Sequence, residues 1–135
     1  MNWEIDYVKD KGIVKVKTSG QRSRDDTKRL SEEALVAGRE KNVNVFLLDQ
    51  KETAFGLSVL EIDRLPSVLR DTGFSVRDWM AVLINPDSLK SSSFRFLQDV
   101  LSLRSLQLQV FNDTEEATAW LKAKPRKHAK PAFES

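Results

Sequence analysis

An acidic residue and a serine near the middle of the chain are the side chains best placed to do chemistry. Asp49 ends the apolar run 43–49, and Ser58 follows at the expected start of a helix. In an open α/β sheet, ligands bind at the carboxyl ends of the strands, which is where Asp49 would lie. A candidate crevice for a ligand or protein partner is therefore formed by Asp49, Phe55, Gly56 and Ser58.

A metal site is conceivable at the same place. Asp49, Glu52 and Asp87 could together supply carboxylate oxygens, which hard cations prefer. A carboxylate at a strand end more often accepts backbone hydrogen bonds, and the fold class alone cannot supply a function. We therefore expect no metal site.

Ser58 has two competing roles. A phosphate there would be electrostatically acceptable, because negative charge is stabilised at a helix N-terminus. Ser58 and Glu61 also form a capping box, and Leu57 and Ile62 have the spacing of a hydrophobic staple. An N-cap serine contributes about 1 kcal/mol to stability, which explains the residue without phosphorylation. We favour the structural role and keep Ser58 as a less favoured phosphosite.

The side chains on which many enzymes depend are scarce. The chain has no cysteine and one histidine, His128, which lies in a basic C-terminal segment. Thiolate chemistry and a histidine-based triad are thus excluded. The five glycines fit neither a P-loop nor a dinucleotide-binding fingerprint. We expect a protein that is not an enzyme and binds no cofactor.

Composition indicates one globular domain, over residues 1–122, and a basic disordered tail, over residues 123–135. The chain has 135 residues and a net charge of +2, and five basic residues against one acidic residue lie from Lys122 onward. The high isoelectric point therefore comes from the tail and does not indicate nucleic-acid binding. Without a long apolar run or a signal-like start, we expect a cytoplasmic protein that does not insert into membranes.

Hydrophobic patterns predict the order ββαβαβαβα. Alternating strands at 2–8 and 12–18 form a hairpin, and an amphipathic helix over 24–41 follows, opened by a capping box at Ser23 and Asp26. The later elements are strands at 43–49, 79–85 and 106–111 and helices at 58–72, at 93–104 and after Asp113. Pro66 should kink or divide its helix, and Gly73 should end it, with Phe74 folding back toward Leu69.

The two middle strands are apolar at nearly every position, which is typical of strands buried on both faces of a parallel sheet. The expected fold is α/β: a single open sheet of about five strands, mostly parallel with an N-terminal antiparallel hairpin strand, and about four helices. If sequential strands are neighbours, the crossover helices all cover one face. The apolar strip on the other face must then be covered by a terminal helix, a second copy or a lipophilic ligand.

This element order, with the segments VFLLDQ (45–50), MAVLINPD (80–87) and LQVFNDTEEATAWL (108–121), resembles the SpoIIAA-like proteins. That group contains the STAS domains and small bacterial STAS/Sec14-type domains. In phospho-regulated STAS domains a serine at the corresponding helix start is phosphorylated, and matching Asp49 places Ser58 on it. Leu57, Val59 and Leu60 replace the Asp, Ser and Gly of that turn.

The resemblance implies a regulatory domain that acts through protein contacts, and its Sec14 side implies apolar ligands. We expect a non-catalytic, STAS-like interaction domain that binds a protein partner or forms a homodimer. The alternative is a binder of a small apolar or lipid-like molecule. A phosphoswitch regulator of the anti-sigma-antagonist type, using Ser58, is the third and least favoured hypothesis.

Overall fold

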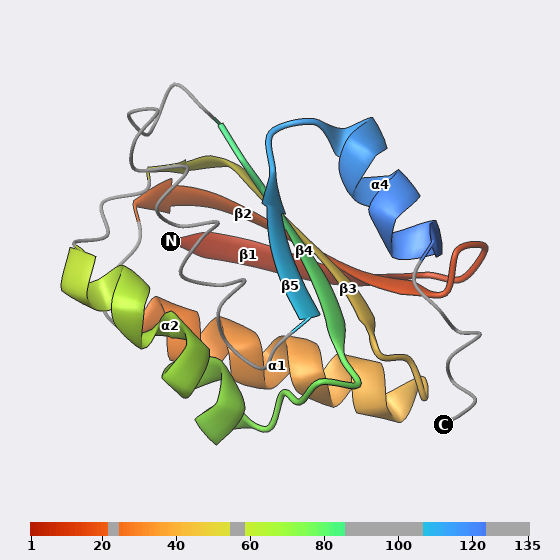
Figure 1. Cartoon of the computed structure of the whole chain (residues 1–135), viewed down its shortest axis with the longest axis horizontal. Coiled ribbons are helices and arrows are strands. Elements are labelled where there is room, and N and C mark those ends of the chain that lie inside the picture. The colour runs from red at the N-terminus through yellow and green to blue at the C-terminus, as the bar shows by residue number, and fades with distance from the viewer. Residues whose placement is uncertain (22–24, 55–58, 86–106, 124–135) are drawn as a thin grey trace.

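The residues that the computed structural model describes form one open sheet with helices on both faces (Figure 1). They are residues 1–21, 25–54, 59–85 and 107–123. The strands are β1 (Asn2–Val8), β2 (Ile13–Gln21), β3 (Val45–Ala54), β4 (Trp79–Ile84) and β5 (Gln107–Phe111). They pair in the order β1-β2-β3-β4-β5, with β1 antiparallel to β2 and each later pair parallel. The expected α/β class and single open sheet are confirmed.

The N-terminal hairpin forms as its pattern predicts. Gly12 adopts a φ of 62°, a left-handed conformation that glycine reaches without steric cost, and its N–H donates to the Val8 carbonyl at 2.9 Å. Across the pair, Ile5 lies opposite Val16, so the apolar residues of both strands share one face. β1 therefore becomes one edge of the sheet, and β5 becomes the other.

The core consists of two layers, one on each face of the central strands. Phe46 and Leu48 of β3 belong to the first layer, and Val45 and Leu47 belong to the second. Because successive side chains of a strand point to opposite faces, a run without polar positions must be buried on both. β3 and β4 meet this requirement by lying inside the sheet.

The helices divide between the two faces. α1 (Asp26–Glu40) and α2 (Val59–Thr72) cover one face, and α4 (Thr114–Ala123) covers the other (Figure 1). Each of α1 and α2 connects two parallel strands, and right-handed crossovers between sequential neighbours place such helices on the same side. The helix expected over 93–104 lies outside the described residues, which hold three helices.

α1 and α2 both end in the same hydrogen-bonded motif. At the end of α2, Gly73 has a φ of 126°, its N–H donates to Arg70 at 3.0 Å, and the Phe74 N–H donates to Leu69 at 3.0 Å. This is the Schellman pattern, and Phe74 packs with Leu69 in the core as predicted. At the end of α1, Asn42 takes the glycine position with a φ of 57°, and the Val43 N–H reaches the Gly38 carbonyl at 2.8 Å.

The start of α1 and the course of α2 agree less closely with what the sequence predicts. α1 begins at Asp26, and the preceding Asp25 makes no side-chain capping bond, whereas Ser23 of the expected capping box lies outside the described residues. α2 begins at Val59 and continues through Pro66 as one helix, so the helix is not divided there. A proline removes a single N–H donor from a helix, and the packed turns on either side can outweigh that loss.

Gly38 provides a test of how closely α1 packs on the sheet. A Cβ atom at this position would lie 2.6 Å from the Phe46 ring and 2.8 Å from the Val43 carbonyl oxygen. Helix propensity alone predicts that Gly38→Ala stabilises the fold by about 1 kcal/mol. We expect the opposite, a loss of about 1–2 kcal/mol in the free energy of unfolding by urea titration, because overpacking dominates.

The matched experiment is a double-mutant cycle with Phe46→Leu, which removes the two ring atoms that approach the added Cβ and leaves the Val43 carbonyl oxygen in place. The loss caused by Gly38→Ala should shrink by at least about 0.5 kcal/mol in the Phe46→Leu background. Additive effects, or a stabilising Gly38→Ala, would contradict this close approach.

Candidate functional site

The structure places only part of the crevice expected from the sequence. Asp49 lies in the middle of β3, which continues to Ala54, so Asp49 does not end the strand as the sequence suggested. Its side chain is nearly buried, and its Oδ1 accepts the Lys51 N–H at 3.2 Å. Phe55, Gly56 and Ser58 lie outside the described residues. The bond that Asp49 makes is the local backbone contact that carboxylates in this position commonly form.

The three residues considered as metal ligands are not seen together. Glu52 lies 3.8 Å from the Lys17 ammonium group at the surface, and Asp87 belongs to the part of the chain that is not described. Among the residues that the structure places, no group of three acidic, histidine or cysteine side chains is close enough to hold a metal ion.

Buried polar residues that the sequence did not reveal lie at the same end of the sheet. Thr18 and Thr53 are buried, and their hydroxyl groups hydrogen-bond to each other. The Thr18 hydroxyl also lies 3.5 Å from the Asp49 carbonyl oxygen, near the irregularity in the β2–β3 register. Because both hydroxyls are partnered, they stabilise the strand pair and are not poised to react.

The apolar strip on the second face of the sheet is covered by the chain itself. Ala117 and Leu121 of α4 are buried against Val45, Leu47 and Leu83. At the border of this layer, the Trp120 ring lies 4.9 Å from Trp79 and 5.7 Å from Phe111, centroid to centroid. The terminal helix, one of the covers expected from the sequence, therefore packs on this face.

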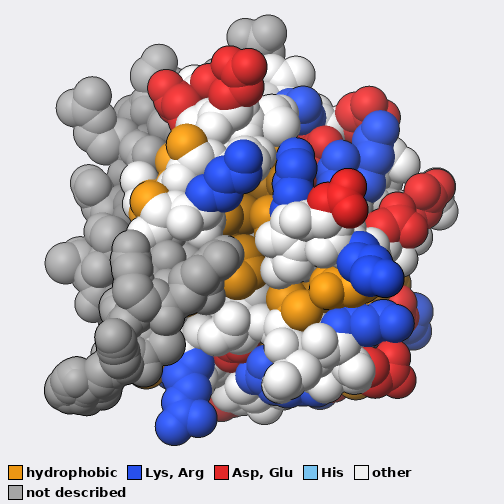
Figure 2. Space-filling model, turned by 90° about the vertical axis from the view of Figure 1, so that its right-hand side faces the viewer, with side chains coloured by type: hydrophobic (Ala, Val, Ile, Leu, Met, Phe, Trp, Pro, Cys, Tyr) orange, Lys and Arg blue, Asp and Glu red, His pale blue; other side chains and the backbone are white. Residues whose placement is uncertain are grey.

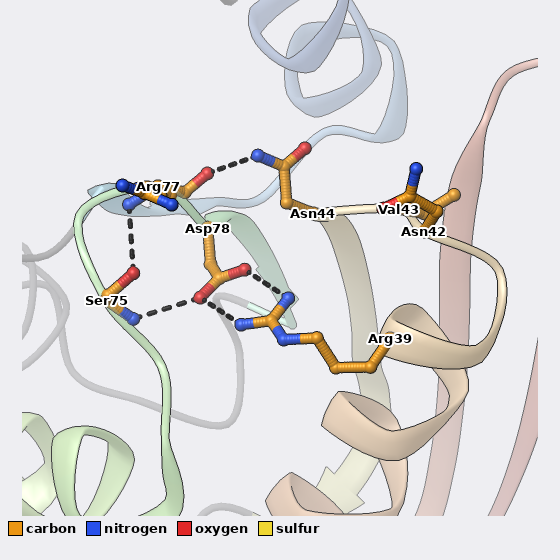
Figure 3. Close-up of a pocket in the computed structure, with 7 residues that line it drawn as sticks. All are labelled: Arg39, Asn42, Val43, Asn44, Ser75, Arg77 and Asp78. Atoms are coloured by element: carbon orange, nitrogen blue, oxygen red, sulfur yellow. Dashed lines mark hydrogen bonds and ion pairs between the residues drawn. The ribbon is translucent and has the colours of Figure 1, made fainter.

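An open hollow of about 630 Å³ lies at the opposite end of the parallel strands (Figure 3). Arg39, in the last turn of α1, reaches across it to Asp78, which directly precedes β4. The two guanidinium nitrogens Nη1 and Nη2 donate to Oδ1 and Oδ2 at 3.0 Å each, and the Ser75 N–H donates to Oδ2 at 2.9 Å. The hydrogen bond to Asp78 raises the pKa of Arg39 above its ordinary value, while burial acts in the opposite direction.

The polar groups that line this hollow make contacts within the protein, which leaves few of them for a ligand. Asp78 is 3% exposed, and both its oxygens are occupied by protein donors. Asn44 closes the same region by donating from Nδ2 to the Arg77 carbonyl at 2.6 Å (Figure 3). The C-termini of α1 and α2 lie nearby, and their negative dipole ends disfavour an anion. We interpret Arg39–Asp78 as a clamp between α1 and β4.

A second depression lies between β1 and α1, and we call it the β1–α1 groove. It has a volume of about 450 Å³ and is lined by Ile5, Glu32, Glu33, Val36, Ala37 and Glu40. Val36 is 56% exposed, although it lies on a helix packed against the sheet. No strand among the described residues pairs with the outer edge of β1. The groove therefore adjoins a strand edge whose outward N–H and C=O groups have no strand partner in the part of the chain that the structure describes.

Two contacts hold the walls of this groove together. Trp3 Nε1 donates to Glu33 Oε1 at 2.9 Å, and the Lys41 ammonium group lies 5.7 Å from the Tyr7 ring centroid. Two residues of a strand advance about 6.6 Å, and four residues of a helix advance about 6 Å. Every second residue of β1 therefore lies level with every fourth residue of α1. The contacts of Trp3 with Glu33 and of Tyr7 with Lys41 follow this match, and Ile5 and Ala37, which lie between them in sequence, both line the groove.

Basic side chains elsewhere on the sheet face acidic partners. Lys15 lies opposite Asp6 and Lys17 lies opposite Glu4 across the β1–β2 pair. Figure 2 shows the side of the molecule that is on the right in Figure 1, where basic and acidic side chains are interspersed among small patches of apolar side chains. This distribution agrees with lysines that solvate a strand face and protect it from aggregation.

Comparison with known proteins does not assign this chain to a family. No family model matches the sequence, and no curated protein matches it.

No helix among residues 1–21, 25–54, 59–85 and 107–123 is long and apolar enough to cross a membrane.

The Arg39–Asp78 clamp predicts an asymmetric response to substitution. Asp78 is buried, whereas the Arg39 side chain is 49% exposed. Arg39→Met leaves a buried carboxylate without its cation and should cost about 2–3 kcal/mol, whereas Asp78→Asn frees a guanidinium that can reach water and should cost about 1 kcal/mol. Chemical denaturation of the two variants measures this difference. Arg77→Met, at an exposed neighbour, is the control and should stay within about 0.5 kcal/mol; a larger loss for Asp78→Asn than for Arg39→Met would refute the clamp.

Proposed function

We propose that this chain is a non-catalytic, STAS-like interaction domain that binds a protein partner at the β1–α1 groove and the outer edge of β1. The observation that carries the proposal is that an open groove lies beside a strand edge that no strand among the described residues pairs with. An exposed edge pairs readily with another chain, so an edge of this kind is normally shortened, charged or covered. A cytoplasmic location and a single domain over residues 1–122 remain part of the proposal.

A docked segment could use backbone and side-chain contacts together. β1 has seven residues, long enough for a regular ladder with an added strand. Beside it, Val36 and the half-buried Ile5 offer apolar surface, and Ala37 leaves space between them. Backbone hydrogen bonds would supply affinity, and the groove would select the side chains.

Self-association through this edge is disfavoured. If two copies of β1 paired antiparallel about Ile5, Glu4 would lie opposite Asp6 of the second copy. Centring the pair on Glu4, or on Asp6, would place that one acid opposite its own copy in the second chain. Like charges directly opposite each other destabilise a strand pair. We therefore favour a different protein as the partner over the homodimer that the sequence also allowed.

The other two hypotheses have less support. α4 fills the second face of the sheet, which was the first location considered for an apolar ligand. The remaining location, at Asp49, Phe55 and Gly56, is described only at Asp49, and the same limit applies to a phosphoswitch at Ser58. Both stay predictions from the sequence.

Site-specific photocrosslinking in the native cell tests the proposal. A benzophenone side chain at position 36 should produce one dominant adduct with a single partner, identified by mass spectrometry. Position 76 is the matched control, because Val76 is 53% exposed and lies outside the groove. Reversal of the groove charge by Glu32→Lys with Glu40→Lys should abolish the adduct.

Two results would count against this function. The first is the same set of adducts from positions 36 and 76, which would mean nonspecific contact. The second is no adduct at position 36 while the protein is folded and abundant. An adduct with twice the mass of the chain would instead identify a second copy and overturn the argument against self-pairing.

A further inference from the structure

Resting on the proposed function, we infer that the partner presents an extended segment in which basic and apolar side chains alternate. This segment lies along the outer edge of β1 and extends the sheet by one strand. The two faces of β1 differ in chemistry, and their difference specifies the two sets of side chains that fit.

The helix-side face of the edge calls for apolar side chains. Trp3, Ile5 and Tyr7 point to the side of the sheet that α1 covers, and Trp3 and Ile5 pack against the core. An added strand would place every second side chain in the same row, beside Ile5 and against the exposed Val36. Burial of this surface is favourable only if the incoming side chains are apolar.

The other face of the edge calls for basic side chains. Glu4 and Asp6 are exposed there, and residues directly opposite them on an added strand would interact with their carboxylates. Lys17 and Lys15 already face these acids from β2, which reduces their attraction without removing it.

The wall of the groove adds negative charge. Glu32 and Glu40 stand one helical turn before and after Val36, and neither has an ion-pair partner among the described residues. These glutamates lie on the helix-side face, whereas the basic side chains of the added strand point to the other face, so the glutamates attract the segment through their overall negative field and not by direct pairing. The pattern that fits is therefore basic-apolar-basic-apolar along the length of β1.

The chain's own basic tail does not fit this pattern. Residues 124–135 contain Pro125 and Pro131, with five residues between them, whereas β1 has seven. Proline lacks the N–H that a strand ladder needs, and the run RKHAK between the prolines does not alternate. We therefore assign the edge to a segment of another protein.

Fluorescence anisotropy with the full chain tests the inference. The probe is a fluorescein-labelled heptapeptide of alternating lysine and valine, with lysine at both ends. Its isomer with four lysines followed by three valines has the same charge and composition. We expect the alternating probe to bind about tenfold more tightly than the isomer, and to weaken by about tenfold when alternate backbone nitrogens are methylated. Raising the salt from about 0.05 to about 0.5 M should also weaken it.

Two variants with matched exposure locate the site. Val36→Lys removes the apolar contact and offsets one of the two negative charges of the adjacent glutamates, and it should weaken the probe by about tenfold. Val76→Lys makes the same change at an equally exposed valine outside the groove and should leave the affinity unchanged. Hydrogen exchange of the β1 amides should slow when the alternating probe is bound, because their outward N–H groups gain acceptors.

Equal affinity for the alternating probe and its isomer, or equal effects of the two valine variants, would overturn the inference. Displacement of the probe by a synthetic peptide of residues 124–135 at similar concentration would overturn the assignment to another protein. A specific adduct at position 36 in cells, without probe binding, would keep the interaction function and reject this partner chemistry. Failure of both experiments would reject the function itself.

Discussion

The arrangement of the whole molecule depends on two strands that are apolar on both faces. Neither face of β3 or β4 can be left to water, because each carries a continuous row of buried side chains such as Phe46 and Leu83. The right-handed connections from β2 to β3 and from β3 to β4 place α1 and α2 on one face. The second face therefore needs a helix that does not connect two strands, and α4, which follows the last strand, takes this place.

Because helices cover both faces of the sheet, the polar groups of the sheet lie at its strand ends and its edges. The centre of the sheet is filled from both sides, and the polar groups near the strand ends are partnered internally, as Thr18 is with Thr53. The two helix C-termini are held by local backbone motifs, and Arg39 fixes the end of α1 to the start of β4. Among the described residues, β1 and β5 form the two edges of the sheet, and beside β1 the packing of α1 forms a shallow groove.

The candidate site could be predicted only in part. The spacing of Glu32, Val36 and Glu40 is visible in the sequence as one stripe of α1, and it indicates an apolar residue between acids on an exposed face. That this stripe adjoins an open strand edge depends on the strand order, since Ile5 and Val36 meet only after β1 has paired with β2. The expected crevice at Asp49 was inferred from the general position of sites in α/β folds, and the part that the structure describes makes an ordinary backbone contact. Arg39 and Asp78 are 39 positions apart, so no local sequence pattern predicts their ion pair.

The sequence by itself determined the features that depend on short stretches of chain. The hairpin turn at Gly12, the end of α2 at Gly73 and the buried character of β3 and β4 follow from backbone freedom and periodicity within a few residues. Tertiary structure alone decided which face α4 covers, that Gly38 must lack a side chain to admit the Phe46 ring, and that β1 lies at an edge of the sheet. These features depend on contacts between distant residues, whose geometry is set when the helices and strands pack together and is encoded in no single segment.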